Sequence, residues 1–112
     1  AEGLASLAIA GVFYLRRAIR AFRESLTLSP DQPEVLVRLG RALLDDGRPR
    51  LACTCLDRVL TLEPASVSSL LWRAQARYEM GDREGAVRDA LAARAAGKIP
   101  APLMGTVAWL TR

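Results

Sequence analysis

The pentapeptide Leu26-Thr27-Leu28-Ser29-Pro30 returns further along the chain as Leu60-Thr61-Leu62-Glu63-Pro64, at an offset of 34 in the numbering. The same offset joins further pairs of identical residues, namely Leu36 and Leu70, Ala42 and Ala76, Gly47 and Gly81, Ala52 and Ala86, and, carried backwards, Ala8 and Ala42 and Ala18 and Ala52. A fixed period of this length is the signature of a repeat protein, in which each unit is one supersecondary element that stacks on the next. The chain is therefore predicted to be an array of units whose length equals this offset.

Each unit has the pattern of two short helices. Apolar residues recur with helical spacing over residues 36–43 and again over residues 51–60. Between the two stretches, Gly47 can end one helix in a left-handed conformation and Pro49 can begin the next. Pro64 ends the second helix, because a proline disfavours helical backbone geometry in the residue before it. We therefore expect each unit to be an antiparallel helical hairpin.

The composition fits an all-helical globular protein. Of the 112 residues, 51% are hydrophobic and only 5% aromatic, so a core of Ala, Leu and Val is expected. The net charge is +4, with basic and acidic residues interspersed rather than gathered in a run, which argues against a nucleic-acid partner. Cys53 and Cys55 lie two apart in a predicted helix, where their side chains do not face each other. We expect reduced thiols and a cytoplasmic location.

The residue types that catalysis and metal binding need are missing. The chain has no histidine, which removes the commonest general base and metal ligand. Cys53 and Cys55 have no second pair at zinc-ligand spacing, and the glycines stand singly at turns rather than in a phosphate-binding loop. Asp45 and Asp46 adjoin each other at a helix end, where a solvated turn is expected. We predict no enzymatic activity, no cofactor and no metal site.

The repeated positions resemble the pattern of the tetratricopeptide repeat family. The central unit supplies the residues that the family uses for packing and turns, namely Leu36, Leu39, Gly40, Gly47, Ala52, Leu56, Val59 and Pro64. The next unit supplies Leu70, Ala74, Gly81, Ala86 and Ala93. The first unit matches less well, since Phe13 stands where the turn glycine belongs, and in the third unit Arg73 replaces a large apolar residue. The resemblance covers about nine tenths of the chain.

The resemblance implies one domain with a specific architecture. It predicts an all-α, right-handed superhelix of about three helical hairpins, at about residues 1–32, 33–66 and 67–98. The stretch from about residue 101 to 111 has an amphipathic stripe of its own. Because the last unit of a repeat array exposes an apolar face that a terminal helix usually covers, we expect a capping helix there.

The resemblance also implies a function. In this family the first helix of each hairpin lines a concave groove, so a scaffold or adaptor that holds a peptide or helix of a partner protein is expected. The implied groove residues are Val37, Arg38, Arg41, Leu44, Leu71, Trp72, Gln75 and Tyr78. Arginine and aromatic residues concentrate binding energy at protein interfaces. Arg38 and Trp72 hold equivalent positions in successive units, which predicts a cation–π contact between them.

The family's best-defined peptide site does not carry over. That site grips the C-terminal tails of heat-shock chaperones with paired lysines, asparagines and an arginine. The matching positions here hold Leu4, Arg38, Trp72, Glu34 and Ser68. Only Arg38 is of a suitable type, and Glu34 would repel a carboxylate. We therefore do not expect this particular specificity.

The N-terminal helix presents a second candidate interface. Leu4, Leu7, Ile9 and Val12 place apolar groups around most of its circumference, and a helix that is apolar all round is normally buried. No charge occurs from Gly3 to Leu15. This stretch is too short to cross a membrane by itself, because a membrane span needs about 20 apolar residues.

This helix could be covered in three ways. Further repeats could lie upstream, a partner chain could pack on it, or it could meet a membrane through a longer upstream apolar run. The alternative functions are a membrane-associated assembly factor, or a secretion-type chaperone or co-subunit, with Leu4 and Leu7 in the interface.

Overall fold

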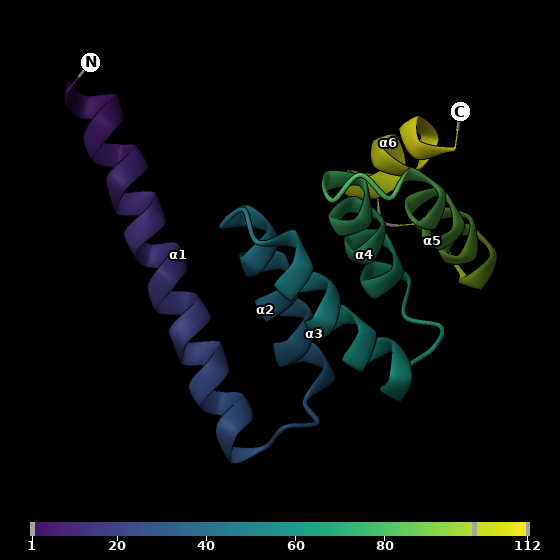
Figure 1. The fold of residues 1–112 in the computed structure, drawn as a ribbon, viewed down its shortest axis with the longest axis horizontal. Helices are drawn as coiled ribbons and strands as arrows, with labels where there is room; N and C mark the ends of the chain where they lie inside the picture. Colours follow the sequence, from purple (N-terminus) through teal and green to yellow (C-terminus); the bar gives the residue numbers. More distant parts are fainter. Residues whose placement is uncertain (1, 100, 112) are drawn as a thin grey trace.

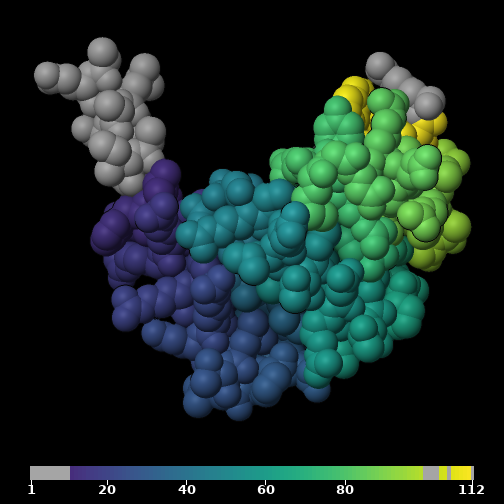
Figure 2. All heavy atoms as spheres, viewed as in Figure 1, coloured from purple at the N-terminus to yellow at the C-terminus, as the bar shows by residue number. Residues whose placement is uncertain are grey.

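The structure, a computed structural model, describes residues 2–99 and 101–111, with the side chains of residues 11–99, 104–105 and 107–111. These residues form helices and no strand (Figure 1). The helices are α1 (Glu2–Leu28), α2 (Pro33–Asp45), α3 (Pro49–Leu62), α4 (Val67–Glu79), α5 (Arg83–Ala96) and α6 (Ala101–Leu110). In Figure 2 the colours follow one another in order across the molecule, so each helix packs beside its neighbours in sequence.

Two glycine turns close the hairpins α2–α3 and α4–α5. Gly47 and Gly81 have φ values of 73° and 86°, in the left-handed region that glycine enters without steric cost. At the first turn, the Arg48 N–H donates to the Leu43 carbonyl at 2.8 Å and the Gly47 N–H donates to the Leu44 carbonyl at 3.0 Å. This pair of bonds is a Schellman motif, which satisfies carbonyls that a helix end leaves free. The predicted turn chemistry is therefore confirmed.

Small residues let the paired helices approach closely. Ala52, Ala74, Ala86, Ala90 and Ala93 are fully buried between helices. A Cβ atom placed on Gly40 would lie 3.0 Å from Leu56 Cγ, tighter than an ordinary contact, so Leu56 would have to shift to admit a side chain where α2 packs against α3. Around these sites, Leu43, Leu56 and Leu71 supply the largest buried apolar side chains.

The first unit differs from the expected hairpin, because α1 runs as one continuous helix through its middle. Position 13, which is equivalent to Gly47 and Gly81, holds phenylalanine, and position 15, which is equivalent to Pro49, holds leucine. A left-handed conformation would cost a non-glycine residue about 1–2 kcal/mol. Without a glycine to turn or a proline to restart, the helix continues. Its N-terminal part projects beyond the end of α2 in Figure 1.

The helix α6 continues the repeat. It begins at Ala101, whereas α4 begins at Val67 and α2 at Pro33, so the three helix starts are separated by the same offset as the sequence repeat. Val107 and Leu110 of α6 are buried against the α4–α5 hairpin. The terminal helix thus covers the last hairpin as predicted, and it does so in the position of a first helix of a further unit.

No helix among the described residues combines the length and the apolar character needed to cross a bilayer.

Candidate functional site

The candidate site is a groove formed by the first helices of successive units, α2, α4 and α6. These helices start one sequence period apart, so Arg41, Gln75 and Trp109 occupy equivalent positions. Side chains of α2 meet those of α4, and side chains of α4 meet those of α6. The groove therefore has two halves, which differ in chemistry.

In the α2–α4 half, a cation–π contact is present but its arginine differs from the predicted one. The guanidinium carbon of Arg41 lies 5.1 Å from the centroid of the Trp72 ring, whereas Arg38 was expected there. The reason is the direction of helical side chains, which reach back over the turn that precedes their own Cα atom. Arg41, one turn beyond Arg38, is therefore the arginine that arrives over Trp72.

Arg38 instead lines a hollow of about 320 Å³ beside the N-terminal ends of α2 and α4. Its other lining residues are Pro33, Glu34, Val37, Glu63, Ser66 and Ser68. Arg38, Glu34 and Glu63 are all exposed, so this hollow offers one cationic and two anionic groups beside the apolar Val37.

The α4–α6 half is aromatic. Tyr78 and Trp109 pack edge to face, with ring centroids 4.6 Å apart and ring planes at 80°, a favoured arrangement for aromatic pairs. They line a hollow of about 460 Å³ together with Gln75, Glu79 and Gly105. Tyr78 and Trp109 remain 40% and 45% exposed. Both rings can therefore offer apolar surface to a partner without any rearrangement.

Two of the predicted groove residues belong to the core instead. Leu44 is 6% exposed and Leu71 is 1% exposed, and both pack within the hydrophobic clusters between helices. They cannot contact a partner, so their assignment to the groove is wrong. The structure brings together Arg41 and Trp72, and places Gln75 with Tyr78, while Val37 and Arg38 lie at the other end. The side chains of Leu4 and Leu7 lie outside the described residues.

A buried ion-pair network holds the groove helix α4 from behind. Arg73 donates to both carboxylate oxygens of Asp89, at 2.9 and 2.8 Å, and Arg77 donates to the same carboxylate at 2.9 Å. Arg73 also donates to Asp57 of α3 at 2.9 Å. The side chain of Asp89 is only 5% exposed.

The hydrogen bonds that Arg73 donates to Asp89 outweigh the desolvation of the guanidinium and raise the pKa of Arg73 above its ordinary value. The network thereby ties α4 to α3 and α5 and fixes which face α4 turns toward the groove.

Three features of the site could have been predicted from the sequence, namely the groove positions of Trp109 and Gly105 and the ion pair of Arg73 with Asp89. The offset that links Arg41 to Gln75 reaches Trp109, and the offset that links Val37 to Leu71 reaches Gly105. Extending the period past residue 98 would have placed both in the groove. Arg73 departs from the family pattern, and its partner Asp89 stands at the position that Cys55 occupies one unit earlier.

Cys53 and Cys55 are unpaired and half-buried in α3, and burial raises the pKa of each thiol above its ordinary value. Among the described residues, no three Cys, Asp or Glu side chains cluster in a way that could hold a metal ion.

Comparisons with known proteins agree with this geometry. A tetratricopeptide repeat family model matches residues 15–78, which is more than half of the chain. The match begins in α1 at the point where that helix takes the place equivalent to α3. No curated protein sequence matches the chain significantly.

Solved structures share the fold at low sequence identity. The Sgt2 domain from Aspergillus fumigatus superposes with a TM-score of 0.81 at 19% identity, covering 99% of this chain and 73% of that one. The first tetratricopeptide repeat domain of Spaghetti (RPAP3), bound to the HSP90 peptide SRMEEVD, superposes with a TM-score of 0.79 at 13% identity, covering 88% of this chain and 78% of that one.

The Yersinia enterocolitica secretion chaperone SycD, in complex with a peptide of the translocator YopD, gives 0.76 at 15% identity, covering 98% and 86%. The chain spans about half the length of MamA, at 54%, with a TM-score of 0.73 and 23% identity over 82% of this chain.

Proposed function

Because the chain belongs to the tetratricopeptide repeat family, we propose that it is a protein-interaction scaffold that holds a peptide or short helix of a partner protein against α2, α4 and α6. The observation that carries this proposal is the arrangement of the groove side chains. Arg41 lies over Trp72, and Tyr78 lies against Trp109, on the three helices that share one face. These residue types dominate the energetics of protein interfaces.

The chemistry of the groove favours an amphipathic partner segment. The α4–α6 half offers two aromatic rings and a hollow of about 460 Å³, which is large enough for a bulky apolar side chain. The α2–α4 half offers the exposed charges of Arg38, Glu34 and Glu63. A segment with an apolar anchor at one end and charges of both signs at the other satisfies both halves.

The fold neighbours support a peptide as the ligand. The Spaghetti domain holds the peptide SRMEEVD, and SycD holds a peptide of its translocator. The present groove differs from a chaperone-tail site because Glu34 and Trp72 stand where that site needs amide and basic groups. We therefore expect a different sequence preference, with no requirement for a free C-terminal carboxylate.

We propose that the chain has no enzymatic activity. We also propose that it acts in the cytoplasm. The two cysteines stand unpaired in one helix, which is the ordinary state of thiols in a reducing compartment.

The proposal can be tested without knowing the partner. A random dodecapeptide library displayed on phage is selected against the chain, and selected sequences are synthesised and titrated by fluorescence anisotropy. Tyr78→Ala and Arg38→Glu change exposed groove residues, and circular dichroism verifies that each variant keeps the helical content of the unmodified chain. We expect each variant to weaken binding, with a loss of about 30-fold for a residue that contributes about 2 kcal/mol.

Arg50→Glu is the matched control, because Arg50 is an exposed arginine on α3, which is not a groove helix. Selected peptides that bind Tyr78→Ala and Arg38→Glu as tightly as the unmodified chain, or that respond only to Arg50→Glu, would place the binding surface elsewhere.

A further inference from the structure

The N-terminal half of α1 carries, among its described side chains, exposed apolar groups that point in several directions. Val12, Phe13 and Tyr14, here named the aromatic tip, are 46%, 60% and 66% exposed. Consecutive residues of an α-helix point about 100° apart, so these three side chains face three different directions. No single neighbouring helix could cover them together. A medium that surrounds the helix could.

A row of arginines follows immediately on one side of α1. Arg16, Arg17, Arg20 and Arg23, here named the arginine collar, occupy the next two turns of α1. The guanidinium carbon of Arg17 lies 6.0 Å from the Phe13 ring centroid, which links the collar to the tip.

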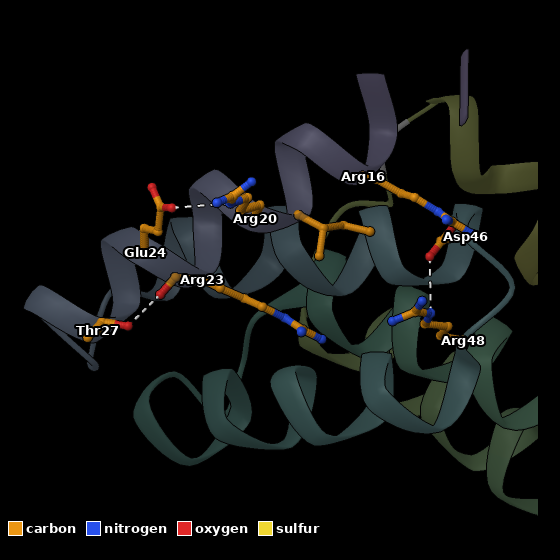
Figure 3. A pocket seen from close by; sticks show the side chains of 8 residues that line it. Arg16, Arg20, Arg23, Glu24, Thr27, Asp46 and Arg48 are labelled. Atoms are coloured by element: carbon orange, nitrogen blue, oxygen red, sulfur yellow. Dashed lines mark hydrogen bonds and ion pairs between the residues drawn. The ribbon is translucent and has the colours of Figure 1, made fainter. Parts of the chain in front are cut away.

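Three collar residues, Arg16, Arg20 and Arg23, also line a hollow of about 350 Å³ shared with Arg48 of the α2–α3 turn (Figure 3). In that view Arg23 extends from α1 toward Arg48.

The collar carries more positive charge than its neighbours neutralise. Two carboxylates line the same hollow, those of Glu24 and Asp46. Glu24 pairs with Arg20 at 3.5 Å, while Asp46 lies 3.1 Å from Arg48 and 3.9 Å from Arg16, with its side chain only 8% exposed. The four guanidinium groups that line the hollow, those of Arg16, Arg20, Arg23 and Arg48, outnumber these two carboxylates. An excess of positive charge therefore lies beside the apolar tip.

We propose that this end of α1 docks on an anionic lipid bilayer, with the aromatic tip in the interfacial layer and the arginine collar on the lipid phosphates. Aromatic side chains favour the boundary between hydrocarbon and headgroups. Arginines beside them gain about 1 kcal/mol each from a negatively charged membrane surface. The guanidinium group also binds phosphate oxygens through two parallel hydrogen bonds.

The length of the uncharged stretch limits the depth of insertion. Residues Gly3–Leu15 carry no charge, and at about 1.5 Å per residue this stretch is about 20 Å long as a helix. The hydrocarbon core of a bilayer is about 30 Å thick. The uncharged stretch is therefore too short to cross the core, and the proposal is docking from one side with the repeat body outside.

A second copy of the chain fits this surface less well than lipid does. Pairing two aromatic tips would bring two arginine collars together, and their like charges would repel, whereas lipid phosphates neutralise the collar. The docking proposal does not depend on the groove function, because the tip and collar lie on α1 and the groove on α2, α4 and α6.

The test is flotation of the chain with vesicles made of two parts phosphatidylcholine to one part phosphatidylglycerol, beside vesicles of phosphatidylcholine alone. We expect binding to the anionic vesicles, weakened at least about tenfold by Phe13→Asp with Tyr14→Asp. Arg17→Glu with Arg20→Glu should weaken it similarly, since each arginine removed costs about fivefold. All four side chains are exposed, and circular dichroism will verify that the variants keep the helical content of the unmodified chain.

Two matched variants serve as controls. Leu28→Asp changes an exposed apolar residue, 89% exposed, at the opposite end of α1. Arg50→Glu with Arg88→Glu changes the net charge as much as the collar variant does, on other helices. Both should float like the unmodified chain.

Three outcomes would overturn the proposal. The first is no flotation with anionic vesicles, and the second is equal flotation with neutral ones. The third is a dimer in light scattering without lipid that Phe13→Asp dissociates, because the tip would then be a contact between copies. The groove variants Arg38→Glu and Tyr78→Ala should float normally, which separates this test from that of peptide binding.

Discussion

At the scale of single residues, equivalent positions in the two hairpins have exchanged an apolar contact for an ionic one. Leu39 and Cys55 in the α2–α3 hairpin correspond to Arg73 and Asp89 in the α4–α5 hairpin. Leu39 is 4% exposed, and Asp89 is likewise 4% exposed. A charge can occupy the place of a buried apolar residue when its hydrogen bonds are satisfied, and here two arginines satisfy one carboxylate.

Asp89→Ala should destabilise the fold strongly. It leaves Arg73 partly buried without its main partner, and breaking such a pair costs about 3 kcal/mol or more. Urea unfolding followed by circular dichroism would measure the loss.

The double change Arg73→Leu with Asp89→Cys copies the α2–α3 hairpin into α4–α5 and should recover most of the stability. A double variant no more stable than Asp89→Ala would show that the two hairpins need different packing at these positions.

The two thiols should make stability depend on pH in the alkaline range. Burial raises the pKa of Cys53 and Cys55 in the folded chain, so the folded state holds these protons more tightly than the unfolded state. Their contribution is fully present below the unfolded thiol pKa of about 8.5 and is lost as pH rises above it. Between pH 7 and pH 10 the urea midpoint should fall less for Cys53→Ala with Cys55→Ala than for the unmodified chain. Equal falls in both proteins would contradict this expectation.

At the scale of elements, one residue type decides whether a unit becomes a hairpin or a continuous helix. Gly47 and Gly81 adopt positive φ and turn the chain, whereas Phe13 at the equivalent position leaves α1 unbroken. The departure was visible in the sequence. Its consequence was harder to predict, because a helix end also depends on which neighbouring helices are available to pack against.

Glycine-to-alanine changes should therefore have opposite effects at the two kinds of site. Gly47→Ala forces a Cβ into a left-handed turn and should cost about 1 kcal/mol. Gly11→Ala lies inside α1, where an added Cβ meets nothing within 4 Å, and should stabilise the chain by up to about 1 kcal/mol. Thermal unfolding of both variants measures the contrast. A stabilising Gly47→Ala would mean that the turn tolerates another conformation.

At the scale of the whole molecule, the fold was predictable and the details of the groove were only partly so. The period, the turn glycines and the helix-starting prolines determine the order of helices. The period also gives the equivalence of Arg41, Gln75 and Trp109. It does not say that Leu44 and Leu71 are buried or that Arg41 rather than Arg38 covers Trp72. Those outcomes depend on how far each helix is rotated against its neighbours, and packing sets that rotation.

The stacked arrangement also predicts a gradient of local stability. Leu43, Leu56 and Leu71, on α2, α3 and α4, are each at most 1% exposed, because the central helices are covered by neighbours on both sides. The residues around the aromatic tip of α1 are exposed, and α6 is covered on one side. In a repeat array, each element is stabilised by its nearest neighbours alone, so the ends open with less free energy than the centre.

Native-state hydrogen exchange measured by mass spectrometry should show this gradient directly. We expect amides of α3 and α4 to exchange most slowly, at a rate limited by global unfolding, and amides of α6 and of α1 near Gly11–Tyr14 to exchange at least about a hundredfold faster, since terminal elements open locally. Asp89→Ala should raise exchange in α4 and α5 more than in α1, because the network it breaks joins α4 to α5. Equal protection from α1 to α6 would mean that the array unfolds as a single unit, and that the stacked helices are coupled more strongly than nearest-neighbour packing allows.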